Sequence, residues 1–279
     1  MSMSRQRRWE QIFTYVGAAV VFLLIVFPMY GLVLTSIQEE DDIRSPDLDL
    51  IPRYILTDHY REVLREGHIV PIREAMGNSL MVSVATAVIT LLFAFPATYA
   101  LTRLKLWGSK AILGALMSIY LFPVMLFVAP LYVKAVQFGL IDTYIGLIIP
   151  YVAFSLPFSI WLLKGFLEGI PVEIEEAAHL DGCTPWQLFA HIVIPLMRPG
   201  IFAVMLMVFI LAWTEFLTPL LFTRDIKILT VQLGLYRSTF DIKIGQMAAA
   251  AVLTALPVVL LTAFFQRIIT QAITAVVDK

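Results

Sequence analysis

AMGNSLMVSVATAVITLLFAFPATYALT, residues 75–102, contains no Asp, Glu, Lys or Arg and decides the class of fold. A helix rises about 1.5 Å per residue, so about 20 apolar residues cross the roughly 30 Å hydrocarbon core of a bilayer. The stretch is longer than a barrel strand and does not alternate polar with apolar residues as such strands do. It therefore predicts a transmembrane helix.

Five further segments have the same character. Four of them contain no charged residue, and the other one contains only Glu215. They are residues 11–38, 111–133, 143–163, 199–223 and 244–266. Backbone amides inside lipid must be paired within the chain, and long apolar segments achieve this as helices. We expect an all-α membrane protein, a single domain over residues 1–279 built as a bundle of six transmembrane helices.

Composition excludes several classes of protein. The chain is 59% hydrophobic and 15% charged, with a mean hydropathy of +0.84, which nearly excludes a water-soluble enzyme. Its net charge of -1 provides no basic field, so we expect no nucleic-acid partner. Cys183 is the one cysteine, and the four histidines show no metal-ligand spacing. We therefore expect neither a disulfide within the chain nor a metal site.

Charge near the first segment indicates the orientation. Lys and Arg divide equally between the two sides of the predicted bundle, so the count alone does not decide. Arg5, Arg7 and Arg8 precede the first segment, whereas the acidic residues 39–42 follow it. Because the first helix often dominates topology, cytoplasmic termini are favoured.

The loop KGFLEGIPVEIEEAAHLDGCTPWQLFAHIVIPLMR, residues 164–198, predicts two short helices outside the membrane. Pro171 suits the first helical position, and the glutamates that follow it suit the positive end of a helix dipole. Gly182 suits a helix end because it tolerates positive φ. Thr184 begins a capping box, and Pro195 is expected to end the second helix. The alternative is a solvated connector that needs no partner.

This loop carries a resemblance to a known family. The run Glu176-Ala177-Ala178, then Gly182, then Ile-Val-Ile-Pro at 192–195 resembles the EAA signature of permease subunits of binding-protein-dependent ABC importers. Other pieces resemble the smaller permease of the maltose-type carbohydrate branch. They are Phe27-Pro28, Asn78-Ser79-Leu80, Tyr99-Ala100-Leu101, residues 139–144 and Gln266-Arg267. One departure is Thr214, where the family usually has asparagine.

The resemblance implies a mechanism and a location. Two permeases would surround a central path, two cytosolic ATPases would bind ATP and Mg²⁺, and an external solute-binding protein would deliver a sugar. The chain would lie in the inner membrane of a prokaryote with both termini in the cytoplasm. No G-x-x-x-x-G-K-[ST] phosphate loop occurs in it, so we expect no ATP hydrolysis and no cofactor in this chain.

The same resemblance implies the residues that couple the permease to the ATPase. Glu176 would pair with a basic residue of the ATPase, and Gly182 would allow the turn. The full predicted coupling set is Glu175, Glu176, Ala177, Ala178, Asp181, Gly182 and Pro195.

Three residues are candidates for the translocation path: Glu215, Trp213 and Asn78. An acid inside a span is costly unless it faces a wet cavity or a partner, so Glu215 indicates either a path or a carboxylate that locks two helices. Two rival functions stay open. One is import of a non-sugar solute such as glycerol phosphate or another polyol, and the other is a secondary transporter that works alone.

Overall fold

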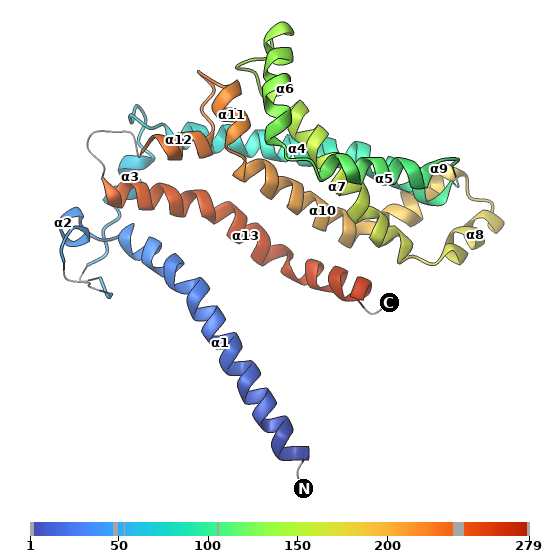
Figure 1. Cartoon of the computed structure of the whole chain (residues 1–279), viewed down its shortest axis with the longest axis horizontal. Helices are drawn as coiled ribbons and strands as arrows, with labels where there is room; N and C mark the ends of the chain where they lie inside the picture. Colours follow the sequence, from blue (N-terminus) through green and yellow to red (C-terminus); the bar gives the residue numbers. More distant parts are fainter. Residues whose placement is uncertain (1–2, 47–49, 53, 105, 237–242, 278–279) are drawn as a thin grey trace. The chain divides into compact units, whose positions relative to one another are not determined.

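The computed structural model describes residues 3–46, 50–52, 54–104, 106–236 and 243–277. All regular structure among these residues is helical (Figure 1). The helices are α1 (Met3–Thr35), α2 (Glu40–Ile43), α3 (Asp58–Val63), α4 (Ile72–Arg103), α5 (Ser109–Tyr120), α6 (Met125–Gln137), α7 (Tyr144–Glu168), α8 (Val172–Leu180), α9 (Pro185–Leu188), a π-helical turn (Phe189–Val193), α10 (Ile194–Thr214), α11 (Leu217–Phe222), α12 (Leu229–Leu235) and α13 (Ile244–Val277).

Within the described residues, five helical segments are long and apolar enough to cross a membrane. They are α1, α4, α7, the run that ends with α10, and α13. The bent pair α5 and α6 would be a sixth span if it is counted as one. The prediction of an all-α membrane protein is therefore confirmed.

Two of the predicted spans are broken. Residues 111–133 do not form one helix, because α5 and α6 meet at an angle of 92° and Pro123 lies between them. Residues 199–223 do not form one helix either, because Glu215 is extended, with φ -68° and ψ 133°. Pro219 lies in the first turn of α11 and cannot donate to the carbonyl of Glu215, which favours a new helix start there. The six predicted spans are thus present if the bent pair counts as one, but the segments at residues 111–133 and 199–223 are each interrupted.

The chain divides into two compact units, and the first consists of residues 1–73 and 233–256. The loop that follows α1 is tied to the end of that helix by a hydrogen bond between the hydroxyls of Ser36 and Tyr60 at 2.7 Å. On α1 itself the apolar side chains are largely exposed, with Phe13 at 83% and Leu24 at 69%. Lipid stabilises such a surface, whereas water does not.

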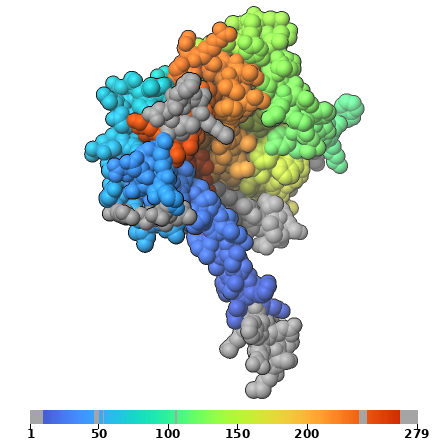
Figure 2. Space-filling model, turned by 60° about the vertical axis from the view of Figure 1, so that its left-hand side comes forward, coloured from blue at the N-terminus to red at the C-terminus, as the bar shows by residue number. Residues whose placement is uncertain are grey.

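The second unit consists of residues 74–232 and 257–279. Helices α4, α6, α7, α10 and α11 contribute to one apolar cluster in it. Its buried members are Val82, Val128, Ala135, Leu147, Tyr151, Ala212, Phe222 and Ile228. Helix α11 lies beside α6, where the orange and light green surfaces meet in Figure 2.

Helices α7 and α10 pack closely because α10 has a glycine at their contact. A Cβ on Gly200 would lie 2.6 Å from Cγ of Phe166, so only glycine fits there without a shift of the ring. This contact joins the two helices whose ends carry the candidate sites.

Candidate functional site

The loop between α7 and α10 forms the predicted elbow. Helix α8 begins directly after Pro171, and Gly182 has a φ of +82°. The N–H of Gly182 donates to the carbonyl of His179, and the N–H of Cys183 donates to that of Ala178, both at 3.1 Å. These bonds form a Schellman motif, which needs a residue that tolerates positive φ. The predicted turn at Gly182 is confirmed.

The second elbow helix begins with the predicted capping box. Oγ1 of Thr184 accepts from the N–H of Gln187 at 3.3 Å, and Oε1 of Gln187 accepts from the N–H of Thr184 at 2.9 Å. Two backbone donors at the helix start are thereby satisfied within the helix itself.

Pro195 does not end this helix, and the prediction that it does was wrong. Helix α9, the π-helical turn Phe189–Val193 and α10 form one run from Pro185 to Thr214. Pro195 lies in the first turn of α10, directly after the π turn, where a missing N–H is tolerated. The loop therefore does not reach residue 198, and the elbow continues into the membrane span without a break.

A buried ion pair fixes the elbow to the end of α4. Nε of Arg103 lies 2.7 Å from Oε1 of Glu175, and the two side chains are 11% and 8% exposed. The guanidinium also donates to the carbonyls of Leu167 at 2.9 Å and Ile170 at 2.7 Å. The hydroxyl of Tyr99 donates to Glu175 at 3.1 Å. One arginine thus joins the ends of α4 and α7 to the start of α8.

Away from this ion pair, the elbow exposes apolar side chains. Leu180 is 90% exposed and Trp186 is 73% exposed, while Val172 and Ile174 are 45% and 40% exposed. Three of these side chains lie on α8 and Trp186 lies on α9, where its ring also stacks on Phe189 at a centroid distance of 6.1 Å.

The predicted coupling residues do not share one environment. Glu176, Ala177, Asp181 and Gly182 are exposed, Glu175 and Ala178 are buried, and Pro195 is half-buried. Because Glu175 is bound to Arg103, its carboxylate is not available to a partner. It positions the elbow instead.

The sequence places Glu215 inside a span, residues 199–223. In the structure Glu215 lies at the break between α10 and α11 and not inside a helix. Its carboxylate accepts from the N–H of Thr218 at 3.0 Å and from the hydroxyl of Tyr151 at 3.2 Å. No Lys or Arg in the described part of the chain pairs with it. The carboxylate lines a cavity of about 170 Å³.

The other two path candidates lie outside the lining of this cavity. Trp213 is 2% exposed and its ring stacks on Phe209 at 5.6 Å. Asn78 donates to the carbonyl of Lys227 at 2.9 Å and accepts from the hydroxyl of Tyr144 at 3.0 Å. Their contacts are those of packing and of loop support.

Asp142, just before α7, is an organising residue that the sequence analysis missed. It has a φ of +58°, and its N–H donates to the carbonyl of Phe222 at 2.7 Å. Its carboxylate accepts from the N–H groups of Arg224, Asp225 and Ile226 at 2.9, 3.1 and 3.0 Å. These N–H groups, that of Arg224 first, hold the pKa of Asp142 below its usual value. A single carboxylate therefore shapes the loop after α11.

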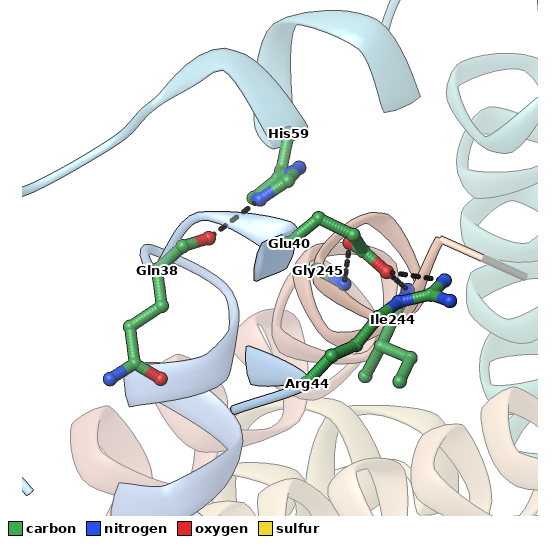
Figure 3. Close-up of polar contacts among 6 residues, drawn as sticks. All are labelled: Gln38, Glu40, Arg44, His59, Ile244 and Gly245. Atoms are coloured by element: carbon green, nitrogen blue, oxygen red, sulfur yellow. Dashed lines mark hydrogen bonds and ion pairs between the residues drawn. The ribbon is translucent and has the colours of Figure 1, made fainter. Parts of the chain in front are cut away.

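Glu40 was also missed, because its acidic run served only as a topology signal. Its two oxygens accept from the N–H groups of Ile244 at 2.7 Å and Gly245 at 3.1 Å, and Arg44 lies 3.2 Å away (Figure 3). Partial burial acts to raise the pKa of Glu40, but these donors outweigh it and the pKa is lowered. Glu40 caps the start of α13, where a helix dipole favours an anion.

Comparisons with known proteins agree with this geometry. Residues 87–275 match the family described as binding-protein-dependent transport system inner membrane component. The chain is 32% identical over 274 residues to the inner membrane ABC transporter permease protein YcjP of Escherichia coli, with 98% of each chain covered. It is also 32% identical to the trehalose transport system permease protein SugB of Mycobacterium tuberculosis, covering 99% of this chain and 98% of that one.

A solved structure shares the fold. A chain of a bacterial ABC transporter involved in the import of the acidic polysaccharide alginate superposes with a TM-score of 0.76 at 21% identity. The match covers 93% of this chain and 97% of that one. The two chains thus share their overall fold.

Proposed function

The chain belongs to the family of binding-protein-dependent transport system inner membrane components, and from that premise we propose that it is the sugar-conducting permease of an importer whose ATPase binds the elbow. As a member of this family it is a multi-pass inner membrane permease of an ABC importer. The sugar substrate, the coupling through the elbow and the orientation of the termini are the proposed parts.

One observation carries the proposal of coupling: the elbow is held rigidly at its base and exposes apolar side chains at its tip. The Arg103–Glu175 pair fixes the base, and Leu180 and Trp186 are 90% and 73% exposed. Exposed Glu173 and Glu176 indicate that this elbow lies in water rather than in lipid. A protein partner is then the way to cover the two large apolar side chains.

The proposed partner is a cytosolic ATPase with a basic residue facing Glu176. This chain has no phosphate loop of its own, so ATP and Mg²⁺ would be held by that ATPase. A full importer would contain a second permease, two ATPases and an external solute-binding protein. If the α5–α6 pair is one crossing, four spans precede the elbow and two follow it, so the elbow and both termini share one side of the membrane, which in this proposal is the cytoplasm.

Sugar transport is supported by the relatives. Three of these relatives are named as transporting trehalose, diacetylchitobiose and arabinooligosaccharides.

Copurification tests the coupling proposal. Trp186→Ala should reduce retention of the ATPase by about 30-fold in affinity, because a buried aromatic anchor contributes about 2 kcal/mol or more. Trp107, which is fully exposed between α4 and α5, provides a matched control as Trp107→Ala. Equal retention in both variants and the parent chain would refute coupling through the elbow.

A further inference from the structure

The cavity beside Glu215 lies where two broken helices meet. Its lining includes Tyr120 and Val124 from the break between α5 and α6, and Glu215 and Thr218 from the break between α10 and α11. Non-helical backbone at membrane depth is tolerated only where protein buries it or where it lines a wet cavity. Two breaks at one cavity therefore indicate a site for polar contents.

The carboxylate in the wall needs hydroxyl or water donors. Tyr151 and Thr218 orient it, and no cation of the described residues neutralises it. An ionised carboxylate presents about four acceptor positions, and inside a membrane segment each unmet position is costly. A polyhydroxylated solute supplies such donors without bringing a charge of its own.

Aromatic rings form the other part of the wall. Tyr120 is 42% exposed and stacks on Phe158 at 5.4 Å, and Phe154 lines the same cavity. The face of a pyranose that carries C–H bonds packs well on an aromatic ring, while its hydroxyls point to polar groups. At about 170 Å³ the cavity is smaller than the roughly 300 Å³ at which sites for drug-sized ligands begin, so it suits a single ring.

We infer that this cavity is a subsite for one neutral pyranose ring, with hydroxyls donating to Glu215 and the apolar sugar face against Tyr120. The inference rests on the proposed sugar transport, which it deepens. With this subsite, the permease would contact the solute directly as well as forming part of the wall of the translocation path.

A second cavity provides a built-in control. It is lined by Ile149 and seven other apolar residues of α4 and α7, with no polar side chain among them. Val124 in the proposed subsite and Ile149 in the control cavity are both β-branched and are 42% and 52% exposed. The two positions differ mainly in the polarity of what surrounds them.

Cysteine labelling of the intact importer in lipid nanodiscs tests the inference. Cys183 is the only cysteine of this chain, so Cys183→Ser gives a cysteine-free permease in one step, and labelling is read on this chain after the subunits are separated. Into it, Val124→Cys and Ile149→Cys are placed separately and treated with a charged, membrane-impermeant thiol reagent. The structure predicts that the cysteine at 124 reacts, because its cavity is wet, and that the cysteine at 149 does not.

Protection by a solute then tests the ligand class. Trehalose at about twice its dissociation constant should slow labelling at position 124 about threefold, while mannitol, an open-chain polyol, should not. Glu215→Gln in the same background should keep the labelling and lose the protection. An unreactive cysteine at 124, equal protection by mannitol, absence of protection by trehalose, or protection that survives Glu215→Gln would each overturn the inference.

The failure of this inference is distinguishable from failure of the proposed function. Stimulation of ATP hydrolysis by trehalose and retention of the ATPase are measured in the same nanodisc preparations. Loss of protection with stimulation retained removes only the subsite. An importer that trehalose never stimulates removes the proposed sugar transport, and one that never binds the ATPase removes the coupling.

Discussion

Glu175 and Asp142 hold the two ends of the region around α7, but they do so by different chemistry. Glu175, after α7, is buried and paired with the guanidinium of Arg103. Asp142, before α7, is partly exposed and accepts from three backbone N–H groups. When Asp142 is lost, water can reach the freed N–H groups, whereas a lost Arg103 leaves Glu175 buried as an unpaired charge. The elbow end should therefore be intolerant of substitution, and the Asp142 end should be tolerant of substitution but sensitive to pH.

The largest effect is expected at the elbow end. Arg103→Met should lower the free energy of unfolding by about 3–5 kcal/mol, because it leaves the carboxylate of Glu175 buried without its partner. Thermal unfolding in detergent measures the change. Lys164→Met is the control, since the Lys164–Glu168 pair is 30% and 52% exposed and contributes at most about 0.5 kcal/mol. Similar losses in both variants would break the contrast between buried and exposed pairs.

A smaller effect is expected at the turn of the elbow. Gly182→Val should cost about 1–2 kcal/mol through backbone strain at a φ of +82°, because no atom lies within 4 Å of a Cβ placed there. Gly182→Asn should cost less, since asparagine tolerates this conformation better. If valine and asparagine behaved alike in thermal unfolding, strain would not be the cause.

At the Asp142 end, Asp142→Ala should lower the free energy of unfolding by on the order of 1 kcal/mol, comparable to loss of a helix N-cap. The freed N–H groups of Arg224, Asp225 and Ile226 would be partly rehydrated. Hydrogen exchange at these three amides should rise while exchange around the elbow is unchanged. Faster exchange at both ends would mean that the two ends are not held independently.

The smallest effect is the pH dependence of the stability that Asp142 contributes. A carboxylate with a lowered pKa stabilises the fold above its unfolded-state pKa of about 3.9, and this contribution disappears as pH falls through the lower, folded-state value. Stability of the parent chain should therefore drop below about pH 4 more steeply than that of Asp142→Asn. Glu40 titrates in the same direction in both chains, so the difference between them isolates Asp142. Parallel pH profiles would contradict this role.

The sequence predicts what short-range patterns control. Apolar runs locate the spans, and the local signals at Gly182 and Thr184 locate the turn and the capping box of the elbow. Apolar composition continues through Pro123 and Pro219, so it does not locate the two breaks, whereas a proline lies beside each break and signals that the helix kinks or ends there.

Long-range partners leave no such pattern. Arg103 and Glu175 are separated by 72 positions, and Asp142 binds N–H groups more than 80 positions away. Backbone amides exist at every residue, so nothing in the side chains around Arg224 identifies them as the partners of Asp142. The resemblance marks residues 139–144 as typical of the family but gives them no role. The structure shows that Asp142, within this stretch, binds the backbone after α11.

The helical run from Pro185 to Thr214 is in contact with α7 close to its middle, with about equal lengths on either side. It contains 30 residues, about 45 Å at 1.5 Å per residue, and Gly200 touches Phe166 near its midpoint. With the fulcrum at Gly200, a tilt of about 10° swings each end of this run by about 4 Å in opposite directions. Such a tilt would move Trp186 and Thr214 in opposite senses, and Pro199, next to Gly200, marks the point where the run would bend instead of tilting as one piece.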